Sequence, residues 1–226
     1  MGAQNREYQK VVDYIKKLLI TEKLSVGDKL PAERTIADTL SISRNSTREA
    51  LRMLDHMGVI ASKQGSGNYL VGDIQQNLVD SLSMMLIMRT TNRMEISQFR
   101  RYIELSAFNI VFDRHIDFNT DVLADTLAKM ENASMQDKIH LDKEFHYLFF
   151  SASNNQLMIS IMNALSEIYE NFVEFILTNA DKNIQNRLAQ THHNLYRSFV
   201  AKDKTSGIRA INEHYDIIEK ELLLRK

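Results

Sequence analysis

The chain has 226 residues, of which 44% are hydrophobic and 25% charged, and its net charge is −1; this balance is ordinary for a globular protein of one large domain or two smaller ones. It has no cysteine, which excludes disulfides, thiolate metal sites and a cysteine nucleophile. The longest apolar run, MMLIM at 84–88, is too short to span a bilayer, and the first residues lack a signal-peptide pattern. We therefore expect a soluble, cytoplasmic protein with no membrane partner.

Charge and helix-breaking residues divide the chain at the same place. Residues 1–72 carry 11 Lys and Arg against 8 Asp and Glu, a net of +3, whereas residues 73–226 carry 17 against 21, a net of −4. The single proline, Pro31, and five of the seven glycines fall between residues 27 and 72. We therefore predict a mostly α protein of two domains, 1–72 and 73–226, the second almost entirely helical.

The first domain contains three helical segments followed by a hairpin. Apolar spacing predicts an amphipathic helix within residues 7–21, and Pro31 is expected at the first position of a second helix. Ser43 is a suitable N-cap for a third helix over 44–57, which Gly58 ends. Two short apolar runs around the sequence QGSG then predict a β-hairpin. Three helices and a hairpin in this order are typical of a winged helix-turn-helix domain.

The third predicted helix carries side chains that suit DNA. Arg44 and Arg48 lie in its first turns, and an arginine can make bidentate contact with guanine in the major groove. Ser43, Asn45 and Thr47 add polar groups beside a helix N-terminus, which suits phosphates. The alternative is a solvated helix with ordinary surface arginines. The hairpin weakens that alternative, because its Gly-rich tip could approach a sugar-phosphate backbone closely.

Residues 30–71 resemble the DNA-binding domain of GntR-family bacterial transcription regulators. That family pattern runs Leu-Pro-Ser-Glu-Arg, then Ser-Arg-x-x-Val-Arg-Glu-Ala-Leu, then Gly-x-Gly-Thr-Phe-Val. The resemblance implies that Arg34, Arg44 and Arg48 contact DNA, and that the wing tip Gly65–Ser66–Gly67 reaches the minor groove.

This sequence departs from the family pattern at two positions. Thr47 stands where valine is usual, and Asn68 stands where threonine or serine is usual. The first departure leaves open whether Thr47 packs in the core or contacts a base, and the second bears on a phosphate contact at the wing. Neither changes the expected fold.

The stretch HLDKEFH at 140–146 raises the possibility of a metal site in the second domain. Asp142 and His146 are four residues apart, so on a helix they share one face. Alone, such a pair is more often an intrahelical hydrogen bond. His192 and His214, however, fall on two successive predicted helices that a turn would fold against each other. One aspartate and three histidines suit one divalent metal per chain, with Zn first and Ni, Mn or Fe as alternatives.

The second domain resembles the all-helical FCD domain of the FadR subfamily. Metal-binding members carry Asp-x-x-Phe-His followed by two histidines at the spacing seen here. Asp142 and His146 fit the first part, and the resemblance indicates His192 rather than His193 as a ligand. A further helix predicted over 74–88 favours seven rather than six helices in an antiparallel bundle.

Arg100 and Asn155 are the candidate effector contacts. Asn155 fits the segment that follows the Asp-x-x-Phe-His motif in the resembling domain. Arg100 lies four residues before Glu104 and could hold a carboxylate by a bidentate pair. The alternative, which the spacing favours, is an intrahelical Arg–Glu pair on a solvated face.

These observations predict a ligand-responsive transcription regulator that is not an enzyme. We expect a homodimer that binds a palindromic operator in double-stranded DNA, with a small carboxylate at the metal site altering operator affinity. Two alternatives stay open: an acyl-CoA regulator without metal, and a metal-dependent helical enzyme. Four ligand positions weigh against the first, and the lack of an evident general base weighs against the second.

Overall fold

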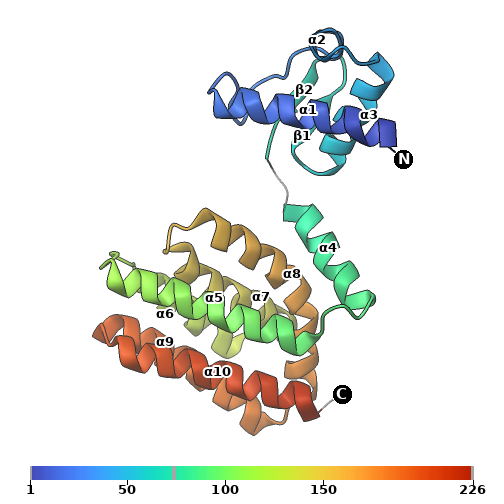
Figure 1. Cartoon of the computed structure of the whole chain (residues 1–226). Helices are drawn as coiled ribbons and strands as arrows, with labels where there is room; N and C mark the ends of the chain where they lie inside the picture. The colour runs from blue at the N-terminus through green and yellow to red at the C-terminus, as the bar shows by residue number, and fades with distance from the viewer. Residues whose placement is uncertain (1, 73–74, 225–226) are drawn as a thin grey trace. The chain divides into compact units, whose positions relative to one another are not determined.

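The computed structural model describes residues 2–72 and 75–224. They belong to two compact units, Met1–Leu78 and Val79–Lys226 (Figure 1). The domain boundary predicted after Gly72 adjoins residues 73–74, which lie outside the described residues, so that boundary stays a prediction. Among the described residues, no helix combines the length and the apolarity needed to cross a membrane.

The first unit is a winged helix-turn-helix, as predicted. Its elements are α1 (Gly2–Ile20), α2 (Glu33–Leu40), α3 (Arg44–His56), β1 (Ile60–Lys63) and β2 (Gly67–Leu70). The two strands pair antiparallel, with Ile60 opposite Leu70 and Lys63 opposite Gly67. Apolar side chains from all five elements form one core, which includes Val11, Ile36 and Leu51. Burying this apolar surface holds three short helices and a hairpin together.

The predicted ends of α3 are confirmed, but the predicted start of α2 is wrong. Ser43 caps α3 by accepting a hydrogen bond from the Ser46 N–H, and Gly58 follows the helix with φ at 68°. Pro31 is not the first residue of α2, which begins at Glu33. Ala32 takes the N-cap position with ψ at 149°, so the helical backbone begins only after it. The Leu30 N–H donates to the Asn68 carbonyl of the hairpin at 2.8 Å.

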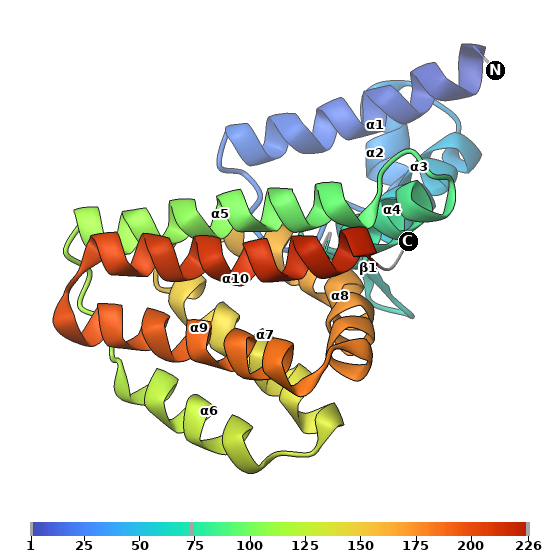
Figure 2. The same cartoon turned by 90° about the horizontal axis from the view of Figure 1, so that it is seen from below.

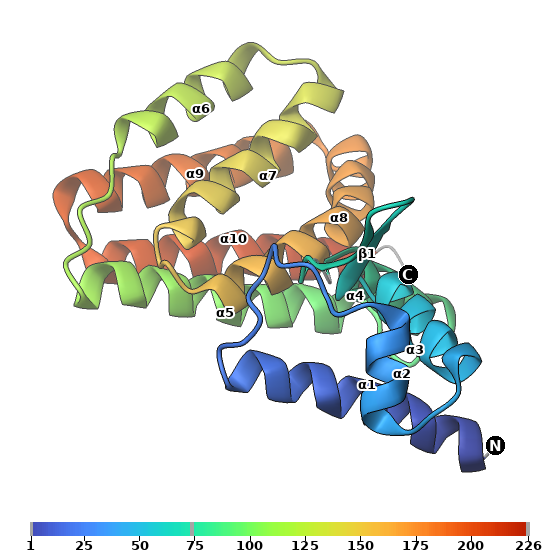
Figure 3. The same cartoon turned by 90° about the horizontal axis from the view of Figure 1, so that it is seen from above.

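The second unit is a bundle of antiparallel helices, as predicted. Its helices are α5 (Arg93–Asp113), α6 (Asp121–Asn132), α7 (Met135–Ser151), α8 (Gln156–Asn179), α9 (Lys182–Ala201) and α10 (Lys204–Leu224), while α4 (Gln75–Ile87) crosses the division between the units. Helix α10 packs against α9 and α5, and α7 packs against α6, α5 and α8 (Figures 2 and 3). With α4, this is the seven-helix form.

Gly207 allows α10 to approach its neighbours closely. A Cβ atom built at Gly207 would lie 2.0 Å from Cζ of Phe108 on α5 and 2.6 Å from Oγ of Ser198 on α9. A side chain at this position would force Phe108 or Ser198 to shift, so glycine favours this packing. The close contact fixes how α9 and α10, which carry His192 and His214, face each other.

Candidate metal centre and nucleic-acid interface

The exposed face of α3 presents the predicted DNA-contacting side chains to solvent. Ser43, Arg44, Asn45 and Arg48 are all exposed. The guanidinium of Arg44 makes no hydrogen bond or ion pair with any side chain that the structure describes. It is therefore available to a phosphate or to a guanine edge.

Arg48 and Arg34 are held in exposed ion pairs. Nη2 of Arg48 lies 3.1 Å from a Glu33 oxygen, with the two side chains 49% and 35% exposed. Nε of Arg34 lies 3.7 Å from Asp38, in a pair that is more exposed still. Exposed pairs of this kind contribute about 0–1 kcal/mol, so DNA could replace them at little cost.

Thr47 does not belong to this exposed face, so its predicted contact with DNA has no geometric support. Its side chain is fully buried, and its hydroxyl donates to the backbone carbonyl of Ser43 at 3.1 Å. The apolar residues Ala50 and Leu51 beside it are also buried. The departure from valine is therefore a packing change inside the unit.

The tip of the β1–β2 hairpin has the backbone conformation expected of a wing. Gly65 and Gly67 have φ values of 71° and 110°, which favour glycine. Gly65 is surrounded by open space, and the Ser66 hydroxyl lies 2.6 Å from the Tyr69 hydroxyl. Sequence reasoning missed Lys29, whose exposed side chain lies beside Gly67, with Nζ 3.7 Å from the position that a Cβ atom of residue 67 would take, and adds positive charge near this tip.

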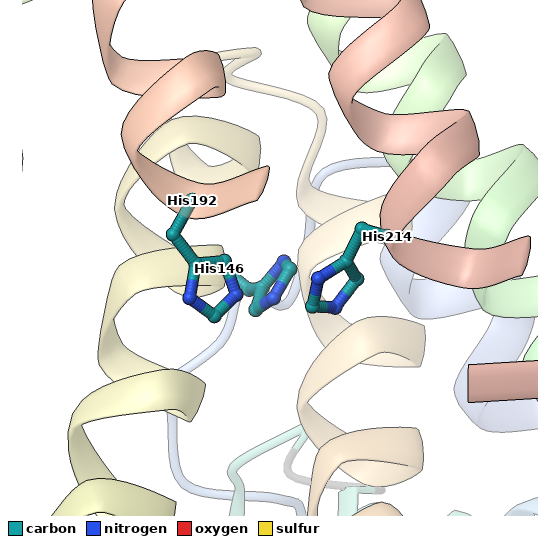
Figure 4. A group of neighbouring side chains, drawn as sticks. All are labelled: His146, His192 and His214. Carbon is teal, nitrogen blue, oxygen red and sulfur yellow. The ribbon is translucent and has the colours of Figure 1, made fainter. Parts of the chain in front are cut away.

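In the second unit, three buried histidines converge from three helices. His146 comes from α7, His192 from α9 and His214 from α10, and Figure 4 shows their rings gathered between these helices. One ring nitrogen of each lies within 4.8 Å of the others. The side chains are at most 5% exposed. Such a group of nitrogen donors could hold a divalent metal.

Asp142 lies beside this cluster. One of its carboxylate oxygens is 3.3 Å from Nε2 of His192 and 4.0 Å from Nε2 of His146. Its side chain is 13% exposed, so it lies between the buried rings and solvent. The structure thus brings the three predicted histidine ligands together and places Asp142 next to two of them, His192 and His146.

His193 is not a member of this cluster. Its Nε2 atom lies 3.8 Å from a carboxylate oxygen of Glu131, and its side chain is one-third exposed. The preference for His192 over His193 therefore agrees with the geometry. It makes His193 a natural control residue.

Two of the three rings are oriented by hydrogen bonds at Nδ1. Nδ1 of His146 lies 3.0 Å from an oxygen of Glu104, and Nδ1 of His214 lies 3.0 Å from the Thr191 hydroxyl. Each contact leaves Nε2 as the nitrogen facing the cluster. Partners of this kind fix the tautomer and orientation of metal-binding histidines. Neither Glu104 nor Thr191 was singled out for this role from the sequence.

His192 provides the test of whether the cluster fits a metal. Among the described residues, neither of its buried ring nitrogens has a hydrogen-bond partner, because the nearby Asp142 oxygen is outside hydrogen-bonding geometry. Buried polar atoms in folded proteins nearly always have a partner. A cation bound between the four side chains would supply one, so the residues present fit a divalent metal.

Burial keeps these rings in the form that binds metal. It lowers the pKa of His192 to about 4, although the Asp142 carboxylate opposes the shift. Burial also lowers the pKa of His214 well below its usual value, and the neighbouring His192 and His146 act in the same direction. Both rings are therefore neutral near pH 7, and only the neutral ring is a ligand.

The Arg100–Glu104 pair is present, but it is not on a solvated face. Nε of Arg100 donates to Glu104 at 3.1 Å, and the side chains are only 3% and 1% exposed. Burial raises the pKa of Glu104, yet His146, Arg100 and the Tyr215 hydroxyl outweigh it and hold the pKa at about 2. The arginine thus neutralises the carboxylate that orients His146.

A cavity of about 300 Å³ opens beside the histidine cluster. Asp142, His192 and His214 form part of its wall. Neither Arg100 nor Asn155 is among its lining residues. Asn155 instead caps α8, where its exposed side chain accepts a hydrogen bond from the Met158 N–H at 3.2 Å. The effector roles of these two residues stay predictions without geometric support.

Both units match known families. Residues 7–70 match the family described as bacterial regulatory proteins, gntR family, and residues 95–217 match the FCD domain. The HTH-type transcriptional regulator LutR of Bacillus subtilis (strain 168) is 26% identical, over 88% of this chain and 94% of LutR. The Glc operon transcriptional activator of Escherichia coli (strain K12) is 24% identical, over 94% of this chain and 87% of that protein. The solved Streptococcus agalactiae GntR shares the fold, with a TM-score of 0.63 at 18% identity over 94% of this chain and 99% of that one.

Proposed function

The chain belongs to the GntR family of bacterial regulators, with an FCD domain, and we propose that this transcription regulator senses a small carboxylate at a metal site. The proposed ligands are Asp142, His146, His192 and His214. The single observation that carries the proposal is the pair of unpartnered nitrogens of His192, buried among three other donors. Three histidines and one carboxylate suit Zn first, with Ni, Mn or Fe as alternatives.

When bound, the metal would supply positive charge and a coordination position that an acid could occupy. The chain's own residues prepare the site for it. Glu104 and Thr191 hold two rings with Nε2 facing the cluster, and Arg100 balances the charge of Glu104. Asp142 stands where the cluster meets the cavity, through which an acid could enter.

The first unit supports operator recognition by α3 and the wing. A single such unit offers a small interface, so we propose a homodimer with its two α3 helices about 34 Å apart on a palindromic site. The acid would change operator affinity only if it binds the two DNA-binding states of the dimer with different affinity.

The proposal is tested first by metal titration. Protein purified without an affinity tag and stripped of metal is titrated with Zn, Ni and Mn salts, and elemental analysis counts the ions bound. We expect one ion per chain in the parent and in His193→Ala. A parent that stays metal-free with all three salts would remove the main support for the sensor.

Operator binding is the second stage. Fluorescence anisotropy on a selected operator is measured with metal-loaded and metal-stripped protein, with and without candidate acids, while sedimentation gives the oligomeric state. We expect a dimer whose operator affinity changes at least about fivefold with the acid, and only when metal is present. An equal acid effect in stripped protein would favour the metal-free acyl-CoA type of regulator.

A further inference from the structure

The cavity beside the histidine cluster is lined by both polar and apolar side chains. The end at the cluster, called here the polar end, is formed by Asp142, His192 and His214. Apolar side chains from α6, α8, α9 and α10 form much of the remaining wall: Leu127, Met130, Ile176, Leu177, Leu188 and Ile218. The other polar residues of the wall are Glu131, Lys138, Gln185, Asn186 and His193. A ligand with its carboxylate at the polar end would therefore have apolar side chains beside much of its length.

The deepest part of the apolar wall is closed to water. Leu127, Ile176, Leu188 and Ile218 are each at most 6% exposed. Aliphatic side chains offer no hydrogen bond, so a hydroxyl group placed against them would lose its bonds to water without replacement. A methylene group in the same place gains free energy from burial. This wall thus discriminates against hydroxylated chains.

The cavity wall carries charges of both signs, the carboxylates of Glu131 and Asp142 and the amino group of Lys138, and the lysine is the group that could attract an anion. Lys138 lies on α7 four residues before Asp142, or about 6 Å along the helix axis, and it lines the cavity. Its amino group makes no ion pair or hydrogen bond with any side chain that the structure describes. By contrast, Lys143 on the same helix lies 2.7 Å from Glu170. Lys138 is therefore free to attract a carboxylate toward the polar end.

We propose that the acid recognised here is a monocarboxylate with an unsubstituted apolar body of about four to eight carbons. This inference rests on the proposed function, because it names the class of acid for that same site. A volume of about 300 Å³ holds roughly ten non-hydrogen atoms if each takes the ~30 Å³ of a liquid water. Octanoate has that number, and acetate would leave most of the apolar wall uncovered.

A chain-length series tests the inference directly. Acetate, butyrate, hexanoate, octanoate and gluconate are titrated calorimetrically into Zn-loaded and metal-stripped protein. We expect affinity to rise up to about fourfold per methylene, the equivalent of ~0.8 kcal/mol, and to level off near eight carbons. Hexanoate should bind more tightly than gluconate, which has the same six carbons but a hydroxylated chain. The rise per methylene should persist without metal, at lower absolute affinity.

Two matched variants test whether the apolar body of the acid lies in the cavity. Ala189→Leu adds a side chain at a residue that lines the cavity, whereas Ala128→Leu makes the same change at an exposed position on α6 outside it. Ala189→Leu should lower the affinity for octanoate about tenfold and leave the affinities for acetate and for metal unchanged. Ala128→Leu should change the affinity for neither acid.

The possible negative results distinguish the proposed metal-dependent acid sensing from the inference about the class of acid. If affinity is flat with chain length, or gluconate binds as tightly as hexanoate, the inference is overturned while metal-dependent acid sensing stands. If Ala189→Leu and Ala128→Leu lower the affinity for octanoate equally, the acid binds elsewhere and the inference is also overturned. If no acid binds a protein that holds metal, both the inference and the carboxylate arm of the proposed function are wrong.

Discussion

The two candidate sites of this chain differ in their exposure to solvent. The DNA-facing side chains of α3 are exposed, and their ion pairs contribute little to stability. The histidine cluster is buried, and its members depend on partners from other helices. Substitutions on the first surface should therefore change binding with little effect on folding, whereas changes around the second should affect both.

The largest effect on stability should come from removing a ring of the cluster. His214→Ala should abolish stoichiometric Zn binding, because one of the gathered nitrogen donors is lost. With Zn at a thousand times its Kd, the parent gains about 4 kcal/mol of unfolding free energy that the variant should lack. Thermal unfolding with and without Zn measures this difference. His193→Ala should retain the whole Zn effect, and equal losses in both variants would contradict the assignment.

The metal-free protein should lose stability in mild acid. His192 titrates at about 4 in the folded chain and near 6.5 when unfolded, so between these values only the unfolded state takes up the proton. Stability should be unaffected by His192 above pH 6.5 and should fall as pH drops from 6.5 to 4, by about 3 kcal/mol. The lowered pKa of His214 acts in the same direction.

Urea unfolding of metal-stripped protein, followed by circular dichroism across this pH range, checks the prediction. His192→Gln should flatten the dependence, while His193→Gln should leave it unchanged. A parent whose stability rises or stays constant from pH 6.5 to 4 would show that the ring is not buried in its neutral form.

The next largest effect on the unfolding free energy should come from a substitution at Gly207. Gly207→Ala places a methyl group against the Phe108 ring and should lower the unfolding free energy by about 1–3 kcal/mol. Phe108→Leu combined with Gly207→Ala should cost less than the sum of the two single changes, because the smaller side chain makes room. Chemical denaturation measures all three variants, and strict additivity would argue against the contact.

The exposed surface should show the smallest effect on stability. Arg44→Ala should weaken specific operator binding by about 1–3 kcal/mol and shift unfolding by less than about 0.5 kcal/mol. Arg52→Ala removes an arginine further along α3, which is paired with Glu49, and should leave operator binding close to that of the parent. Anisotropy titrations at several salt concentrations compare them. If Arg44→Ala binds as tightly as the parent, α3 does not read the operator through this residue.

The same contrast explains what could be predicted from sequence. The wing and the arginines of α3 lie on one continuous segment, so local spacing and family resemblance were enough to find the domain. Asp142 and His146 share one helical face, and a predicted helical hairpin brought His192 and His214 toward each other, but the choice of His192 over His193 came only from the resemblance. Thr47 falls at helical spacing with Ala50, Leu51 and Leu54, so the apolar pattern of α3 already favoured its burial over a contact with DNA.

The hydrogen bond that Glu104 accepts from Nδ1 of His146 could not be predicted, because it joins residues 42 apart in the chain. A signal was nevertheless present. Arg100 and Glu104 fall at helical spacing with Ala107, Phe108 and Val111, on the apolar face of α5. Charged residues on such a face are buried and need partners, which contradicts the solvated pair that the spacing alone suggested.

The close contact at Gly207 also limits how the second unit can move. Sliding α10 along α5 or α9 would drive bulkier residues of α10 into Phe108 and Ser198. Arg101 adds a hydrogen bond between α5 and α10, since its Nη2 donates to the Asn212 carbonyl at 2.6 Å. Helices interlocked in this way resist shear, the sliding of one packed helix past another. We therefore expect α5, α9 and α10 to move together, so that a ligand-driven displacement in this unit would turn the three helices as one.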